Sequence, residues 1–163
     1  EKDPFCGAAA LGHLPAASRI RITHIGGARD PALAAEAQRW MKREPRYIWL
    51  DELARPQALA TLARARAMLI SSLMEGGANV ISEALTARVP VIASKISGNI
   101  GMLGRDYRGY YPMSDARALA TLLGKIETQP EFLAALRAQC MERRKLISAT
   151  QEKRGLRKLL AGS

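Results

Sequence analysis

The sequence predicts an α/β fold in which a parallel β-sheet is flanked by helices. Short β-type runs alternate with helical stretches along the chain, and this alternation is the pattern of a parallel sheet covered by helices. The runs from Met68 to Ile70 and from Val89 to Ala93 are apolar, as expected of strands that are covered on both faces. At 163 residues, the chain is long enough for one domain with its own core and too short for two ordinary ones.

The first half of the chain is predicted to hold three helices and two strands. Its best-marked helix start is Asp30-Pro31, because an aspartate side chain caps free amides and proline suits the first helical turn. The preceding strand ends at a pair of glycines, Gly26 and Gly27. In order, we expect a helix in 4–14, a strand at 19–25, a helix at 31–44, a strand at 46–50 and a helix at 56–65.

The second half is predicted to continue this alternation and to end in two helices. A cap at Ser114-Asp115 opens the first of these helices, and Pro130 opens the second. In order, we expect a strand at 67–72, a helix at 79–88, strands at 89–94 and 107–112, and helices at 115–129 and 130–146.

The composition excludes several classes of protein. No apolar run approaches the roughly 20 residues that cross a bilayer. Cys6 and Cys140 lie far apart with no partner at metal-ligand spacing, which argues against a zinc site and a disulfide framework and indicates reduced thiols in a cytosolic protein. Half of the net charge of +10 lies in residues 141–160, where seven Lys or Arg stand against two Glu in an amphipathic tail.

The connection after strand 67–72 combines a glycine pair with a helix start. Ligands of open α/β sheets collect at the carboxyl ends of strands, where loops run into helices. The first amides of a helix that begins at Asn79 have no partner within the helix, and together with the helix dipole they would attract an anion. Gly76 and Gly77 would let a phosphate approach the backbone closely.

Two glutamates flank this anion site. Glu83 lies one turn deeper on the same helix face as Asn79. Because a carboxylate repels phosphate, we expect Glu83 to accept hydrogen bonds from the neutral hydroxyls of a ribose or another sugar. The alternative is purely structural: Glu75 caps the loop, and Glu83 pairs with a nearby arginine such as Arg88.

The segment SSLMEGGANVISEALTARVPVIAS, residues 71–94, resembles the E-x7-E region of retaining GT-B glycosyltransferases of family 4, the glycosyl transferases group 1. The resemblance covers most of residues 1–127. It implies that the chain is the C-terminal, donor-binding half of a GT-B fold, a Rossmann-like parallel sheet flanked by helices. Residues 1–129 would form the nucleotide-sugar-binding unit, and residues 130–163 a helical segment of the same domain.

The resemblance implies a role for each residue around the glycine pair. Glu75 would contact hydroxyls of the donor sugar, and Glu83 would bind the ribose of the nucleotide. The diphosphate would lie against the backbone amides of Gly77, Asn79 and Val80.

Two further positions match the family. Lys2, in EKDP, resembles the lysine that neutralises the leaving diphosphate, although an exposed terminal lysine is the alternative interpretation. Residues 97–103, SGNIGML, resemble the family's glycine loop, so Gly98 and Asn99 would face the phosphates or the sugar, unless the glycines form a simple turn. Asp51 stands where a glycine is usual, and the sequence therefore does not indicate the nucleobase.

The resemblance implies transfer of a sugar from a nucleoside-diphosphate sugar to an acceptor with retention of configuration. We expect no cofactor and no metal, because the chain contains no D-x-D triplet to hold a divalent cation against the phosphates. The arrangement implies a missing N-terminal acceptor domain, without which the fragment would be inactive, and a cytoplasmic enzyme. The family's first strand, which would lie centrally in the sheet directly before Lys2, is absent, so we expect a gap or a rearrangement at that position.

Two rival functions fit parts of the sequence. A sugar-nucleotide 2-epimerase of GT-B fold also binds a nucleoside diphosphate between two such domains. The basic tail fits a nucleic-acid or membrane-surface binding module. For the transferase, we expect no nucleic-acid partner, and the tail would supply a peripheral membrane contact.

Overall fold

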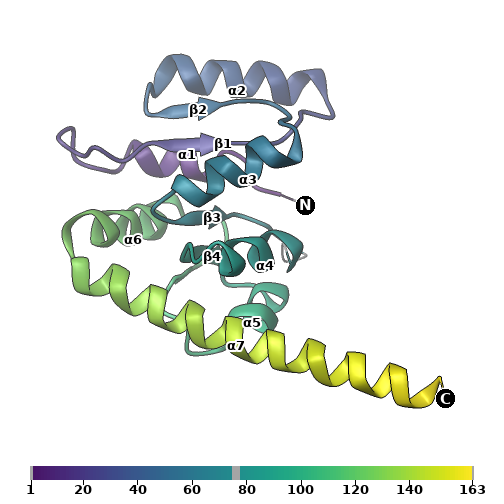
Figure 1. Cartoon of the computed structure of the whole chain (residues 1–163). Helices are drawn as coiled ribbons and strands as arrows, with labels where there is room; N and C mark the ends of the chain where they lie inside the picture. The colour runs from purple at the N-terminus through teal and green to yellow at the C-terminus, as the bar shows by residue number, and fades with distance from the viewer. Residues whose placement is uncertain (1, 75–77, 163) are drawn as a thin grey trace.

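The computed structural model describes residues 2–74 and 78–162, in which helices alternate with parallel strands (Figure 1). The predicted α/β class is confirmed. The elements in chain order are α1 (Cys6–Leu11), β1 (Ile22–His24), α2 (Pro31–Arg43), β2 (Tyr47–Trp49), α3 (Arg55–Arg64), β3 (Met68–Ile70), α4 (Ala78–Thr86), β4 (Val91–Ser94), α5 (Ser97–Leu103), β5 (Tyr110–Tyr111), α6 (Ala116–Thr128) and α7 (Pro130–Ala161).

The strands form two separate parallel sheets. β1 pairs with β2 in one sheet, and β4 lies between β3 and β5 in the other. Within the described residues, β1 and β3 do not pair with each other, although α1 lies behind β1 and α3 crosses in front of the two sheets (Figure 1). A gap between β1 and β3, one of the two outcomes expected next to Lys2, is therefore present among the described residues.

The core is concentrated around the three-stranded sheet. All four residues of β4 are buried, and side chains such as Leu11 of α1, Leu119 of α6 and Leu136 of α7 are completely buried in the same cluster. The helices beside the two-stranded sheet bury much less, since α2 buries only Ala37 and α3 buries no residue. Most of the hydrophobic stabilisation therefore comes from the half of the molecule that contains β3, β4 and β5.

Both cysteines belong to this core. Cys6 and Cys140 are free thiols with 4% of their surface exposed. Burial, together with a smaller effect of the nearby charge of Asp3, raises the pKa of Cys6 to about 11. Burial also raises the pKa of Cys140, whose Sγ atom lies 3.4 Å from the Tyr107 hydroxyl. Both side chains are thus protonated, apolar packing groups at neutral pH.

The helix starts that the sequence predicted are confirmed at two places. The Asp30 side chain accepts a hydrogen bond of 2.8 Å from the Ala32 amide, and Pro31 is the first residue of α2. The Asp115 side chain accepts a hydrogen bond of 2.9 Å from the Ala118 amide at the start of α6. In both helices, a short acidic side chain satisfies an amide that has no partner within the helix.

Two predictions of secondary structure are wrong. Residues 97–103 form helix α5 where the sequence predicted a loop, and α7 continues to Ala161 where a helix ending at 146 was expected. The carboxyl end of α5 is held from outside, because Arg143 donates hydrogen bonds to the carbonyl oxygens of Met102 (2.8 Å) and Gly101 (2.9 Å). Because Arg143 is distant in sequence from α5, these hydrogen bonds are not visible in the segment itself. The glycines of residues 97–103 therefore predicted a loop.

The pairing of β4 with β5 requires a glycine at position 109. A Cβ atom at Gly109 would lie 2.6 Å from the Val91 carbonyl oxygen and 2.6 Å from the Tyr107 ring, both of which are buried in the core. We expect Gly109→Ala to lower the free energy of unfolding by about 2 to 3 kcal/mol, because the strand must shift to relieve the overlap. Urea denaturation measures this change.

Gly101→Ala is the matched control. Gly101 lies in α5, and a Cβ atom there would meet no atom within 4 Å. We expect this variant to be neutral or more stable by up to about 1 kcal/mol, because alanine favours the helix. Equal losses in the two variants would contradict the packing explanation.

Candidate functional site

An open cleft lies at the carboxyl ends of β1 and β2. It has a volume of about 450 Å³. In open parallel sheets, ligands bind outside the carboxyl ends of the strands, so the cleft lies where the fold class places its ligands. Its lining residues are Lys2, Ile25, Gly26, Gly27, Ala28, Arg29, Glu52 and Leu53.

Lys2 connects this cleft with the end of β3. It forms an isolated antiparallel bridge with Ser72, and the next amide, that of Asp3, donates a hydrogen bond of 3.1 Å to the Ser71 carbonyl oxygen. The Lys2 side chain is exposed. These backbone contacts thus hold the Lys2 main chain at the end of β3. The Lys2 and Arg29 side chains both line the same cleft.

The amino end of α4 follows β3 and is open to solvent. Asn79 and Val80 are both exposed, and Val80 exposes 46% of its surface. The opposite face of the helix is buried through Ile81, Ala84 and Leu85. The first turn of α4 is therefore accessible to a ligand, as the predicted anion site requires. The predicted site residues Glu75, Gly76 and Gly77 lie outside the described residues.

Glu83 faces the start of α3. Its Oε1 atom lies 2.8 Å from Nη2 of Arg55, and the Glu83 side chain is 27% exposed whereas that of Arg55 is 75% exposed. The structural alternative named Arg88 as a partner, but the arginine that pairs is Arg55. Sequence reasoning missed this residue, although its place at the start of a helix that follows a strand end was a usable signal.

Gly98 and Asn99 differ in their access to a ligand. Gly98 is exposed in the first turn of α5. Asn99 is completely buried, and its Nδ2 donates a hydrogen bond of 2.8 Å to the Ser94 carbonyl oxygen. Its Oδ1 has no hydrogen-bond partner among the described residues. Asn99 ties the end of β4 to α5, and a direct contact of either residue with a ligand remains a prediction.

The connections that follow β1 and β2 contain one unusual backbone conformation and one side-chain hydrogen bond. Asp51 adopts a φ of 56°, a left-handed conformation that glycine adopts most easily, at the position where a glycine is usual in the family. Trp49 donates a hydrogen bond of 2.9 Å from Nε1 to the Gly26 carbonyl oxygen and packs against the core.

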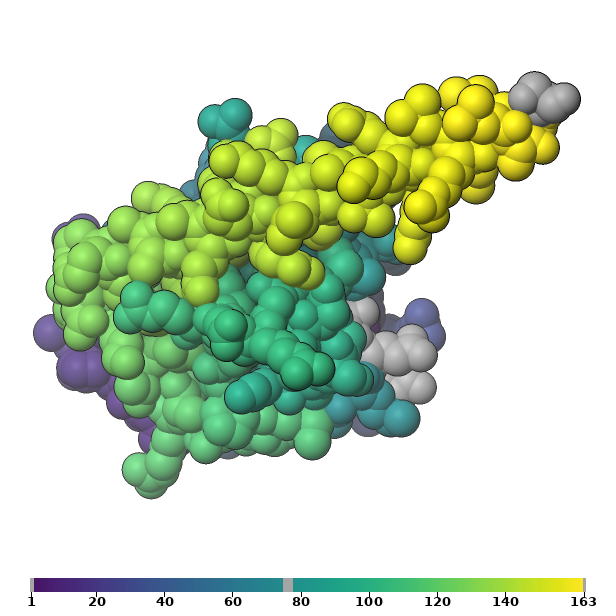
Figure 2. Space-filling model, turned by 90° about the horizontal axis from the view of Figure 1, so that it is seen from below, coloured from purple at the N-terminus to yellow at the C-terminus, as the bar shows by residue number. Residues whose placement is uncertain are grey.

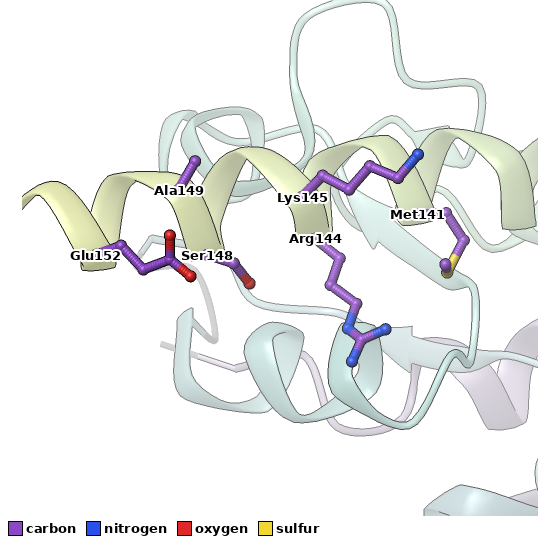
Figure 3. Close-up of a pocket in the computed structure, with 6 residues that line it drawn as sticks. All are labelled: Met141, Arg144, Lys145, Ser148, Ala149 and Glu152. Atoms are coloured by element: carbon purple, nitrogen blue, oxygen red, sulfur yellow. The ribbon is translucent and has the colours of Figure 1, made fainter.

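A second depression lies along α7 and has a volume of about 360 Å³ (Figure 3). All its lining residues among those described belong to α7, so no second element closes it. The lining residues are Met141, Arg144, Lys145, Ser148, Ala149 and Glu152.

Two other kinds of feature are absent from the described part of the chain. Among the described residues, no group of three His, Cys, Asp or Glu is placed to hold a metal ion. No helix in the described ranges is long and apolar enough to cross a bilayer.

Comparison with known proteins identifies the family. The profile of the glycosyl transferases group 1 matches residues 8–129 of this chain. A curated relative, glycosyltransferase 1 domain-containing protein 1 of Xenopus tropicalis, is 28% identical over 113 residues. That alignment covers 69% of this chain and 32% of the relative, so this chain matches about a third of the relative's length.

Several solved structures share the fold. The structure of HepE from Anabaena in complex with UDP and glucose superposes with a TM-score of 0.73 at 19% identity, over 93% of this chain and 45% of that one. WaaG, a glycosyltransferase involved in lipopolysaccharide biosynthesis, gives 0.69 at 20% identity, over 88% and 39%. Sucrose-phosphate synthase from Thermosynechococcus elongatus gives 0.70 at 21% identity, over 99% and 44%.

The position of His24 beside the cleft makes stability depend on pH. Burial lowers the pKa of His24 below its usual value, and the positive charge of Lys2 lowers it further. The unfolded chain therefore binds more protons than the folded one below about pH 6.5, and stability falls as the pH falls through this window. We expect His24→Gln to reduce the stability loss between about pH 7.5 and about pH 5.5.

Urea denaturation at the two pH values measures this difference. The Nδ1 atom of His24 lies 2.7 Å from the Tyr47 hydroxyl, so His24→Gln also changes stability at neutral pH, and only the difference between the two pH values is diagnostic. His13→Gln is the control, because His13 is exposed. An unaltered pH dependence in His24→Gln would exclude His24 as the titrating group.

Proposed function

The chain belongs to the glycosyl transferases group 1, and from this premise we propose that it binds the donor in an enzyme that transfers a sugar from a nucleoside-diphosphate sugar. The observation that supports this most directly is the exposed first turn of α4, the helix that also carries Glu83. Because the chain spans less than half of the related structures, we assign the acceptor site to a second, N-terminal domain. Subfamily 4 and retention of anomeric configuration are part of the proposal.

The diphosphate would lie against the first turn of α4. Unpaired amides and the helix dipole stabilise an anion by up to about 2 kcal/mol per well-placed charge. Asn79 and Val80 are exposed there, and the bridge between Lys2 and Ser72 fixes a cationic side chain at the end of β3. In this proposal, Gly76 and Gly77 allow the phosphates to approach, and Gly98 and Asn99 bound the site from the side of α5.

Glu83 would hold the ribose. Its Oε1 atom pairs with Arg55, which leaves Oε2 to accept hydrogen bonds from hydroxyl groups. The ion pair is weak because the Arg55 side chain is 75% exposed and well solvated. Arg55 thus orients the carboxylate while leaving it able to bind a neutral ligand.

The transfer of the sugar would depend on the positive charge of Lys2 and on the amides of the first turn of α4. Negative charge develops on the leaving diphosphate as the glycosidic bond breaks, and preorganised donors at that position lower the barrier. Lys2 and the amides of α4 would supply this stabilisation, while Glu75 would contact hydroxyls of the donor sugar. UDP-sugars are the donors to test first, since structures of HepE contain UDP with glucose or UDP-glucose.

A second role for the chain concerns α7. Its carboxyl-terminal part extends beyond the body of the molecule (Figure 2), and Leu146, Leu156 and Leu159 expose between 56% and 75% of their surface. Lysines and arginines alternate with these leucines. Exposed leucines beside cationic groups are features of helices that lie on anionic membrane surfaces. We propose that this part of α7 supplies a peripheral membrane contact for the transferase.

The ribose assignment predicts that Glu83→Gln weakens binding of UDP by about 1 to 3 kcal/mol, that is, roughly 5- to 150-fold in Kd. The neutral amide accepts weaker hydrogen bonds from the ribose and loses the pairing with Arg55. Isothermal titration calorimetry measures this affinity. Glu142→Gln is the matched control, because Glu142 lies on α7, is exposed and likewise pairs with a basic side chain, that of Lys145.

A ligand without ribose hydroxyls separates this contact from a general change in the site. The effect of Glu83→Gln should largely disappear for 2′,3′-dideoxyuridine diphosphate, because the two changes remove the same interaction. Unchanged UDP affinity in Glu83→Gln would refute the ribose contact. If no UDP, GDP or ADP bound at all, donor binding by this chain would be refuted.

The membrane contact predicts salt-dependent binding to vesicles that contain phosphatidylserine and no binding to neutral vesicles. The double variant Leu156→Glu/Leu159→Glu should bind at least about tenfold more weakly, because it removes apolar area and adds repulsion. Vesicle co-sedimentation measures both effects. Thr121→Glu on α6, also exposed, is the control; equal losses in the two variants would exclude a specific role for α7.

A further inference from the structure

The buried polar side chains of this protein gather at one place. Apart from tyrosines and cysteines, the polar or charged residues that are buried in the described ranges are Ser72, Ser94 and Asn99. Ser72 lies just after β3, Ser94 ends β4, and Asn99 belongs to α5. Because β3 and β4 run parallel, with Ile70 beside Ala93, Ser72 and Ser94 both lie at the carboxyl ends of the strands, where the fold class places its ligands.

A chain of hydrogen bonds joins the three residues. Asn99 Nδ2 donates to the Ser94 carbonyl oxygen (2.8 Å) and to Ser94 Oγ (3.3 Å). Ser94 Oγ in turn donates a hydrogen bond of 2.6 Å to the Ser72 carbonyl oxygen. A hydroxyl group has a single proton, and because Ser94 Oγ accepts from Asn99, its proton is directed at Ser72. Asn99 thus fixes the direction in which the Ser94 hydroxyl points.

The main chain of Ser72 supports that of Lys2. The two residues form an isolated antiparallel bridge, and next to it the Asp3 amide donates a hydrogen bond of 3.1 Å to the Ser71 carbonyl oxygen. Lys2 lines the open cleft. Because the Lys2 main chain rests on this bridge, a shift of the Ser72 backbone would move the Lys2 side chain relative to the cleft.

The cost of burying these polar groups favours a role in the site over a role in stability alone. Moving an amide or a hydroxyl from water into a protein core is unfavourable, and hydrogen bonds largely offset this cost without turning it into a large gain. For Asn99 the offset is incomplete, since its Oδ1 has no hydrogen-bond partner among the described residues. Departures from an apolar core are expected at functional sites.

We propose that Ser94 is a positioning residue of the donor site. Through the Ser72 carbonyl oxygen, it sets the position of Lys2 against the diphosphate of the nucleotide. Asn99, which is completely buried, serves the site by orienting the Ser94 hydroxyl. This inference rests on the proposed function, because it requires that Lys2 binds the diphosphate.

A double-mutant cycle tests the inference, with calorimetric titration of UDP into the 163-residue chain, or of GDP or ADP if one of these binds instead. Ser94→Ala should raise the Kd at least about fivefold, because the Ser72 carbonyl oxygen loses its donor. Lys2→Met should also raise the Kd. In the Lys2→Met background, Ser94→Ala should change the Kd less than about twofold, because the two substitutions act on the same contact.

Tyr107→Phe is the matched control. The Tyr107 hydroxyl is buried and donates to the carbonyl oxygen of Val91, the first residue of β4, so this variant also loses a hydrogen bond from a hydroxyl to a carbonyl beside the same sheet. It should lower the Tm and leave the Kd unaltered. If Ser94→Ala does not fold, Ser94→Cys replaces it, because a thiol has nearly the same shape and is a weak donor.

Three results would overturn the inference. They are an unaltered Kd in the Ser94 variant, an equal rise of the Kd in Tyr107→Phe, and additive effects of the Ser94 and Lys2 substitutions. The proposed function fails in a different way. A parent chain that binds none of the three nucleotides, or a Lys2→Met variant that binds as tightly as the parent, would refute the proposed diphosphate site and the inference with it.

Discussion

The need of a parallel strand for a hydrogen-bonding neighbour on each side governs this structure. β4 meets this need fully, because β3 and β5 flank it and all its residues are buried. The helices that pack on this sheet supply most of the core. Among the described residues, β1 and β3 meet the need on one side only, and the helices α2 and α3 bury almost nothing. Hydrogen-bond pairing and hydrophobic burial are therefore incomplete at the same place.

The gap between β1 and β3 borders the candidate site. The cleft lies at the carboxyl ends of β1 and β2, the open turn of α4 follows β3, and Lys2 lies between them through its bridge to Ser72. A doubly wound sheet reverses its winding at such a point, which leaves a crevice above the strand ends. The arrangement of strands thus explains why Lys2 and the residues that follow β1 and β2 line one cleft although they are distant in sequence.

Local chemistry in the sequence was sufficient to predict many of the elements. The caps at Asp30 and Asp115 and the apolar run of β4 depend on neighbouring residues, and each appears as expected. Contacts between distant segments were not predictable in this way. Helix α5 is held by Arg143 of α7, and Tyr110 of β5 donates from its hydroxyl to the Gly104 carbonyl oxygen (2.8 Å).

The candidate site also combines features that were predictable from local sequence with contacts that were not. The position of α4 after a strand and the exposure of its first turn followed from the order of elements. The pairing of Glu83 with Arg55 did not, because it joins two helices whose relative position depends on the whole sheet. Glu75, Gly76 and Gly77, which carry much of the resemblance to the family, lie outside the described residues.

The burial of both native thiols has a practical consequence for chemical labelling. Maleimides and related reagents attack the thiolate, and the raised pKa values of Cys6 and Cys140 together with their burial keep that species scarce and inaccessible. A cysteine introduced on the surface would therefore react selectively in an otherwise unaltered chain. Fluorophores or spin labels on α4 and α7 could then report distances in solution without removal of the native cysteines.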